Sequence, residues 1–310
     1  MSATAIPNSA LREARRFSIR LPHWGWFLLL TIVLIVTGIG LAIGIPAGKR
    51  QSAIREIERV GGRVSMESTG PAWLPKIVVN ERLLWNHTTF QAFLPRKRHT
   101  DYRLLGIENL TNLRDLDLGD SQVTDEDLQR LSGLTKLEFL SIKGPQISDL
   151  GLLHLQKMTK IREMRITGPQ ITGTGLSHLS EMAGLEDLTL IRTRVTDDDL
   201  VHLSGLTHLR MLGLLNSQVT AAGLVHLAGL TQLEALSLRD TQVNDENLSL
   251  LAGLKRLQCL DLSGTGITND GLATMKEIAT LKFVIVKRTQ VTEVGITELQ
   301  QATPGVRVEK

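Results

Sequence analysis

Aliphatic residues recur beyond position 100 with a fixed period of 24 positions. One unit carries them at Leu134, Leu137, Leu140, Ile142, Ile147, Leu152 and Leu155. Adding 24 to each number gives Met158, Ile161, Met164, Ile166, Ile171, Leu176 and Leu179. The same register runs without insertion from Leu110 to Leu299, through eight units. Such a period predicts a repeat architecture, because each unit is too small to fold alone and stacking creates one continuous core.

Each unit contains signals for one strand and one short helix. Two leucines separated by a single residue, as at Leu116 and Leu118, predict a strand with one buried face. Leucines spaced by three residues then predict a short helix. Capping boxes with aspartate in place of glutamate are expected at its start, at Thr124 and Asp127 and at Thr196 and Asp199. Helix ends are expected at Gly133, Gly205, Gly229 and Gly253.

These units resemble the leucine-rich-repeat family, whose core reads LxxLxL followed by a polar residue and another aliphatic. The resemblance covers about two-thirds of the chain. It implies an α/β fold: a right-handed solenoid with parallel strands on the concave face and short helices on the convex side. Many members have asparagine at the polar position. Here that position holds Ser121, Pro145, Pro169, Thr193, Ser217, Thr241, Thr265 and Thr289. The two prolines lack a side-chain donor, which leaves open how these two turns are bonded.

An uncharged apolar run precedes the repeats. Residues 27–45 carry no charge, and 19 residues of helix span about 28 Å, close to the thickness of a bilayer core. Trp24 and Trp26 lie at one end, where aromatic rings favour the membrane interface. We therefore expect an uncleaved transmembrane helix within residues 24–47. A cleaved signal peptide is the main alternative, although residues 45–47 make a poor cleavage site.

The formal net charge of +3 is confined to the N-terminal tail. Residues 1–23 carry the whole excess, and the remaining chain is balanced. A neutral body lacks the basic surface that phosphate backbones require, so no nucleic acid is expected as a partner. Basic residues also follow the apolar run, so the positive-inside rule favours neither side strongly. We expect a single-pass membrane protein of a bacterial envelope, with the repeat domain on the extracytoplasmic side.

Five segments follow from these patterns. They are a basic tail (1–23), the transmembrane helix (24–47), a juxtamembrane and N-terminal cap region (48–103), the repeat domain (104–301) and a C-terminal cap (302–310). In the cap region, residues 53–60 look helical and residues 63–67 alternate like a strand. The first core layer is expected to be shielded by Trp85, Phe90, Phe93 and Tyr102. A turn and strand at residues 304–308 would close the other end.

Two further rows of polar residues recur with the period. Four histidines form a ladder on the helical side, at His154, His178, His202 and His226. Neighbouring helices lie about 8–10 Å apart, so the ladder does not converge on one ion and no metal site is expected. Four aspartates are expected to cap helix starts rather than bind calcium, at Asp125, Asp149, Asp197 and Asp245.

No catalytic motif is present in the sequence. The nucleophile elbow, phosphate loop, HExxH and CxxC spacings are all missing. The one cysteine, Cys259, allows no intramolecular disulfide and falls on an outward strand position. We therefore expect no enzyme, no catalytic residue and no cofactor.

The concave face is the expected binding surface. Two columns of outward residues flank the strand leucines, and exposed Ile191, Met211 and Leu215 are expected to cluster there as an apolar patch. The candidate partner-binding residues are Ile191, Met211, Leu215, Phe139, Phe283 and Arg239. We expect a non-catalytic module that recognises a protein partner of unknown identity. A structural or adhesive envelope protein, or an enzyme regulator acting through residues 51–100, are the alternatives.

Overall fold

The chain divides into two compact units, Met1–Pro46 and Ala47–Lys310. The computed structural model describes residues 48–59, 62–68, 88–93, 106–119 and 122–310, all in the second unit. The expected membrane span at 27–45 and the cap residues Trp85 and Tyr102 lie outside the described residues. Within the described ranges, every helix is too short or too polar to cross a bilayer.

The strands of the described residues form one 11-stranded sheet in sequence order. β1 and β2 pair antiparallel, and every later neighbour pairs parallel. The strands are β1 (Arg63–Ser68), β2 (Thr88–Phe93), β3 (Leu113–Leu118), β4 (Phe139–Lys143), β5 (Glu163–Thr167), β6 (Asp187–Ile191), β7 (Met211–Leu215), β8 (Ala235–Ser237), β9 (Cys259–Asp261), β10 (Phe283–Ile285) and β11 (Arg307–Glu309). Residues 24 positions apart, such as Phe139 and Glu163, pair with each other on neighbouring strands. The period of the sequence therefore sets the register of the sheet.

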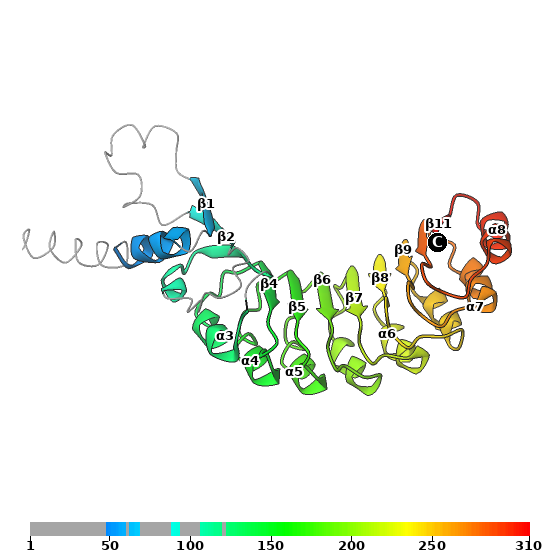
Figure 1. Cartoon of the computed structure of the whole chain (residues 1–310), viewed down its shortest axis with the longest axis horizontal. Coiled ribbons are helices and arrows are strands. Elements are labelled where there is room, and N and C mark those ends of the chain that lie inside the picture. Colours follow the sequence, from blue (N-terminus) through cyan, green and yellow to red (C-terminus); the bar gives the residue numbers. More distant parts are fainter. Residues whose placement is uncertain (1–47, 60–61, 69–87, 94–105, 120–121) are drawn as a thin grey trace, which may run out of the picture. The chain divides into compact units, whose positions relative to one another are not determined.

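Short α- or 3-10 helices connect the strands. They are η2 (Ile107–Asn109), α3 (Asp125–Leu131), α4 (Asp149–Leu153), α5 (Gly173–Ser177), η3 (Asp198–Leu203), η4 (Ala221–Gly223), α6 (Leu224–Leu227), η5 (Leu248–Gly253), α7 (Asn269–Thr274), η6 (Met275–Glu277) and α8 (Glu293–Ala302). In the repeat array, the strands line the inner side of the curve and the helices its outer side (Figure 1). The predicted solenoid with parallel strands on the concave face is confirmed.

The repeated aliphatic positions form a single continuous core. Leu134, Leu140 and Leu155 are fully buried, and their equivalents in the following units are buried as well. No large aliphatic side chain of the 24-residue register points into water, because the strand and helix of each unit both direct their apolar side inward. The prediction of one shared interior is confirmed.

Both ends of this core are covered by elements outside the period. Residues 48–59 form a helix, slightly longer than predicted, and its Ala53 and Ile57 join the core. β1 and β2 extend the sheet beyond β3. At the other end, β11 follows α8, which is the helix of the last unit, and Val306 is buried against that unit. The predicted closing strand is therefore confirmed.

The recurring aspartates bond across repeats rather than capping their own helices. Asp149 Oδ1 accepts the backbone N–H of Thr172 (2.8 Å), and its Oδ2 accepts the Thr172 hydroxyl (2.6 Å). Thr172 is the N-cap residue of the next helix, α5. The same pair of bonds joins Asp125 to Ser148, Asp197 to Thr220 and Asp245 to Thr268. The aspartates therefore bond helix starts, as expected, but those of the next repeat, because a helix of one or two turns lies close to its neighbour.

The two predicted capping boxes differ in outcome. Thr124 and Asp127 form a complete box at the start of α3. Asp199 accepts both the backbone N–H and the hydroxyl of Thr196 (2.8 Å each), but η3 begins at Asp198 and no side chain caps it. The second box is therefore half formed, because this segment is a 3-10 helix that starts one residue later than predicted.

The turns after the strands are of two kinds. From the fourth unit onward the first turn residue is left-handed, with φ of 55° at Arg192, 53° at Asn216, 56° at Asp240, 70° at Gly264 and 56° at Arg288. In the two proline units this backbone is not used, since proline drives the preceding residue toward extended conformations. There the amide of Gln170 donates to the Pro145 carbonyl (2.7 Å), which supplies a turn bond that the proline side chain lacks.

Hydroxyls at the polar turn position bond to a carbonyl three residues earlier. The donors are Ser217, Thr241, Thr265 and Thr289, with oxygen–oxygen distances of 3.0, 2.5, 2.6 and 2.7 Å. In these four units a hydroxyl thus supplies a hydrogen bond within the turn. The glycines Gly133, Gly205 and Gly229 follow the helices as predicted, but they do not adopt the left-handed conformation.

Candidate binding face

The concave face presents three columns of side chains, whereas two columns were predicted from the sequence. The first column joins Phe139, Glu163, Asp187, Met211, Ala235, Cys259, Phe283 and Arg307 through direct strand pairing. The second predicted column includes the paired residues Lys143, Thr167, Ile191 and Leu215. Between them runs a middle column: Asp117, Ser141, Arg165, Thr189, Gly213, Ser237, Asp261 and Ile285. The alternation of the strands could have revealed it, because the residue between two buried leucines must also face outward.

The expected apolar cluster is only partly exposed. Met211 is 43% exposed and Phe283 is 46% exposed. Among the described strands, these two are the only large hydrophobic residues that are exposed. Ile191 and Leu215 pair directly on β6 and β7, but both are half-buried. The expectation that Ile191 and Leu215 are exposed is wrong. Met211 lies at the other end of β7 from Leu215, so the three side chains do not form one compact patch.

A glycine in the middle column explains the burial of Leu215. A Cβ placed on Gly213 would lie 2.8 Å from Leu215 Cδ1 and 3.2 Å from Thr189 Cγ2. The Leu215 side chain therefore lies over the space that Gly213 leaves empty. Ile191 and Leu215 therefore form a flatter and better packed apolar surface than the sequence pattern indicated, and Met211 is exposed at the other end of β7.

The two phenylalanines of the first column each lie beside an arginine. The Arg165 guanidinium carbon is 5.9 Å from the ring centre of Phe139, which is half-buried. The guanidinium carbon of Arg307 is 5.8 Å from the ring centre of Phe283. Contacts of this kind hold both partners in place while leaving part of the ring open.

Acidic residues border Met211 on its N-terminal side. Asp187 is the direct strand partner of Met211, and Glu163 is the next residue of the column. Burial raises the pKa of the Asp187 carboxyl above its usual value, and the nearby Glu163 carboxylate raises it further. Glu163 itself is paired with Arg165 at 2.7 Å. The surface beside Met211 therefore favours a positively charged group on a partner.

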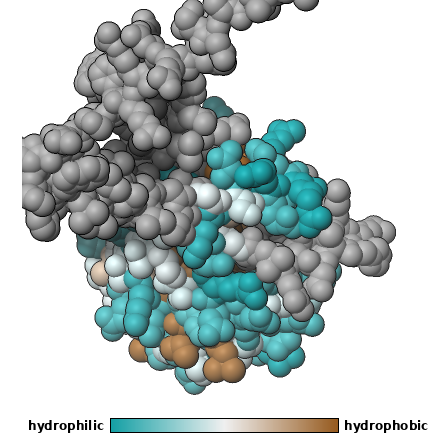
Figure 2. Space-filling view, turned by 90° about the vertical axis from the view of Figure 1, so that its left-hand side faces the viewer, coloured by the Kyte–Doolittle hydropathy of each residue, from teal (hydrophilic) through white to brown (hydrophobic). Residues whose placement is uncertain are grey.

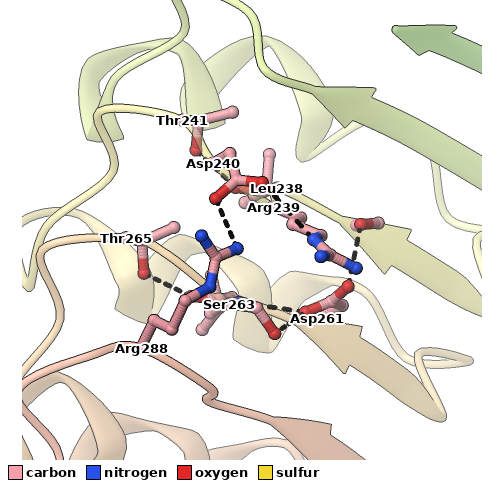
Figure 3. Close-up of polar contacts among 10 residues, drawn as sticks. Leu238, Arg239, Asp240, Thr241, Asp261, Ser263, Thr265 and Arg288 are labelled. Atoms are coloured by element: carbon pink, nitrogen blue, oxygen red, sulfur yellow. Dashed lines mark hydrogen bonds and ion pairs between the residues drawn. The ribbon is translucent and has the colours of Figure 1, made fainter.

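A polar cluster occupies the C-terminal end of the face (Figure 3). Asp240 is paired with Arg288 at 2.7 Å, and with Arg239 at 3.4 Å. The pair with Arg288 spans 48 positions and passes over Gly264, where a Cβ would lie 2.1 Å from Asp240 Oδ1. Nearby, Asp261 accepts the hydroxyl of Ser263 (2.6 Å). Arg239, a predicted binding residue, is exposed and belongs to this cluster.

The thiol of Cys259 is not activated. It is half-buried on β9, as expected for a groove residue. Burial raises the pKa of the Cys259 thiol, and the Asp261 carboxylate adds to the rise. A thiol with a raised pKa is protonated at neutral pH and is a poor nucleophile. Its place on the face is therefore that of a small packing residue.

The helical side carries separate apolar side chains. Leu150 is 68% exposed and Val225 55% exposed, and Val201 lies one unit before Val225. In Figure 2, which views the repeats from their N-terminal end, hydrophobic residues gather at the lower edge, on the helical side. The predicted histidine ladder lies there too, with all four imidazoles half-buried. Among the described residues, no group of three or more His, Cys, Asp or Glu side chains is arranged to hold a metal ion.

Comparisons with known proteins agree with this architecture. Two segments, residues 109–132 and 255–275, match the family described as leucine-rich repeat. No curated protein matches the sequence. Among solved structures 411 chains match, so the scaffold is widely used and does not by itself specify a ligand.

One similar structure is internalin C2 from Listeria monocytogenes, with 29% identity and a TM-score of 0.51 over 66% of this chain and 80% of the internalin. A second Listeria internalin, InlF, shows 21% identity and a TM-score of 0.42, over 71% of this chain and 79% of that one. The Arabidopsis receptor kinase HAESA, solved with a peptide hormone and a co-receptor, shows 19% identity and a TM-score of 0.45, over 60% and 32%. By its own geometry and by the first of these matches, the repeat region has the fold of a leucine-rich-repeat solenoid.

Proposed function

We propose that this protein is a membrane-anchored recognition module that binds a protein partner on the concave face of its repeats. The observation that carries the proposal is the exposure of Met211 and Phe283 on the concave face of the sheet. Solenoids of this kind present extended concave surfaces for recognition. Exposed apolar side chains rimmed by charge are typical of protein-binding sites.

The binding site centres on β6 and β7. Met211 supplies an apolar contact at one end of β7, and Ile191 and Leu215 form a flat apolar surface at the other end of the β6–β7 pair. Asp187 and Glu163 lie on one side of Met211, and the Arg239 cluster lies toward the C-terminal end. A partner with an apolar side chain flanked by a lysine or arginine would match this arrangement.

The anchor is residues 27–45, and the repeats lie on the extracytoplasmic side. The support is the uncharged run of 19 residues behind a short basic tail. Protease added to intact cells should then digest the repeat domain. Protection of the repeats until the membrane is lysed would place them on the cytoplasmic side.

A pair of charged substitutions tests the concave site. We expect Met211→Glu with Leu215→Glu to leave the far-UV circular dichroism spectrum and cooperative unfolding intact, because both side chains face outward. Capture of a partner from cell envelopes by the full-length protein should be lost, because two carboxylates would have to be desolvated at the contact.

The helical side offers a matched control. Val201→Glu with Val225→Glu also introduces two carboxylates at exposed apolar positions. This variant should capture the partner as well as the unmodified protein does. Unchanged capture by the Met211 and Leu215 variant, with loss in the control, would place the site on the helices instead.

A further inference from the structure

One lateral edge of the solenoid carries charges of alternating sign. We call this set the charge ladder; its members lie 24 positions apart and are Arg114, Glu138, Arg162, Glu186, Arg210 and Glu234. Each occupies the start of a repeat strand or the position just before it. Their backbones are joined directly, since Arg162 N–H donates to the Glu138 carbonyl and Glu186 N–H to the Arg162 carbonyl (2.8 Å each). Neighbouring members are thus about 4.8 Å apart, the spacing between strands.

Within one chain the ladder is paired but still open to solvent. Arg114 lies 3.3 Å from Glu138, Arg162 2.8 Å from Glu186, and Arg210 3.0 Å from Glu234. The arginine side chains nevertheless remain 52%, 68% and 55% exposed. A guanidinium has five N–H donors, and one carboxylate takes two of them at most. Each arginine can therefore bind a second carboxylate.

The alternation is self-complementary under a two-fold rotation. Read in reverse, the six signs are the opposite of those read forward. An axis between Arg162 and Glu186 therefore places Arg162 opposite Glu186 of a second copy, and Glu138 opposite Arg210. The outer pair, Arg114 and Glu234, is matched as well. A copy placed parallel and in register would bring like charges together. The ladder thus favours one orientation, that of an isologous dimer.

The edge is hollowed at the centre of the charge ladder. An open depression of about 1060 Å³ lies on it, and its lining includes Glu138, Arg162, Glu186 and Arg210, the four central members of the ladder. Gly184 and Lys160 also line the depression. The same rotation places Lys160 of one copy over Gly184 of the other, where no side chain stands in its way.

The curvature of the repeats does not prevent contact along the whole ladder. The axis runs from the sheet side to the helical side, so both curves bend in the same direction after the rotation. The two edges can follow each other through all six positions. Both concave faces then open to the same side, which leaves Met211 free.

We propose that this lateral edge binds a second copy of the chain, antiparallel, through the charge ladder. The proposal is independent of the function assigned to the concave face. The contact is built from solvent-exposed charges, so it should weaken as salt shortens the Debye length to about 10 Å at 0.1 M.

Exchange of all six charges tests the proposal without disturbing the pairs inside each chain. The swapped variant carries Arg114→Glu, Glu138→Arg, Arg162→Glu, Glu186→Arg, Arg210→Glu and Glu234→Arg. It should fold and should dimerise with itself, because its ladder is again alternating. It should not dimerise with the unmodified chain, because every cross-chain contact would then join like charges.

The measurement is energy transfer between full-length chains in detergent, labelled at the C-terminus with donor or acceptor dye. We expect energy transfer in the sample of unmodified chains and in the sample of swapped chains. For the mixed dimer of one unmodified and one swapped chain, the dissociation constant should be at least tenfold larger. Equal transfer in all three samples would overturn the proposal, since it would place the contact elsewhere, such as residues 27–45. A monomeric unmodified chain at low salt would also overturn it.

A second variant with fewer changes tests the proposal even if the swapped chain does not fold. Arg162→Gln with Glu186→Gln removes only the central charges. It should fold normally, and its dimer should dissociate at least tenfold more readily than that of the unmodified chain. Unchanged dimerisation of this variant would contradict the central position of the axis.

Discussion

At the scale of single residues, Thr193 and Thr265 occupy the same repeat position but differ in bonding. Thr265 Oγ1 donates to the Leu262 carbonyl at 2.6 Å. The Thr193 hydroxyl is buried and has no hydrogen-bond partner. A buried polar group left unpaired costs about 1–3 kcal/mol, whereas a formed bond contributes about 1 kcal/mol. Identical residues at equivalent sites therefore have opposite effects on stability.

This difference predicts opposite outcomes for one substitution. Thr265→Val should lower the free energy of unfolding by about 1 kcal/mol, because it removes the hydrogen bond from the Thr265 hydroxyl to the Leu262 carbonyl. Thr193→Val should leave it unchanged or raise it, because valine has nearly the same shape and no hydroxyl to desolvate. Urea unfolding of the two variants measures both values. Equal losses would show that the Thr193 hydroxyl does have a partner.

At the scale of the elements, five helix starts are bonded by a side chain of the repeat before them. The Asp149 carboxylate bonds Thr172 at the start of α5, and a Cβ on Gly175 would lie 2.4 Å from Asp149 Oδ1. Aspartate or asparagine in one unit therefore requires glycine 26 positions later. The same pairs recur as Asp125 with Gly151, Asp197 with Gly223, Asp245 with Gly271 and Asn269 with Gly295.

One unit reverses the arrangement. Gly173 replaces the aspartate, and Asp199 stands 26 positions later, where the units that follow Asp125, Asp149, Asp197, Asp245 and Asn269 have glycine. Its carboxylate occupies the same space and bonds the N–H and hydroxyl of Thr196 from within its own unit. A Cβ on Gly173 would lie 1.9 Å from Asp199 Oδ1. In these units the bonding side chain can come from either side, and a glycine stands opposite it.

This rule predicts a reversal of the usual effect of glycine in a helix. Replacing helical glycine by alanine ordinarily stabilises by about 1 kcal/mol. Gly175→Ala should instead destabilise by roughly 1–3 kcal/mol, because the new methyl group collides with Asp149. In an Asp149→Ala background the same change should lose most of its cost. A double-mutant cycle by chemical denaturation measures this coupling; additive effects would contradict the rule.

At the scale of the whole molecule, stability is the sum of stacked units and their interfaces. Removing one complete period should therefore preserve the fold. Residues 254–277 are the best choice, because the new neighbours match. Asp245 would then oppose Thr292 and Gly295, and Glu234 would lie beside Lys282.

The expected result of this deletion is a folded protein with a slightly lower melting temperature. Deleting half a period, residues 254–265, should abolish cooperative unfolding, because the core positions then fall out of register. Circular dichroism melting curves compare the two chains. Loss of folding in the full-period deletion would show that the units are not interchangeable.

Much of this architecture could be predicted from the sequence. The aliphatic period determined the strand register, the continuous core and the placement of helices opposite the sheet, because each depends on spacing within one unit. The complete capping box of Thr124 and Asp127 was predictable for the same reason. The two caps at the ends were predicted as elements, from the helical and alternating patterns around residues 53–67 and 304–308.

The tertiary structure decided whatever depends on two units together. Only stacking brings Asp149 to Thr172, aligns Arg162 with Glu186, and lets Leu215 cover the space left by Gly213. The local sequence at each position gives no sign of these contacts, because the partners are separated by one whole period. The amino-acid sequence therefore determined how each unit folds, and the packing of neighbours determined which of its outward side chains remain free to bind.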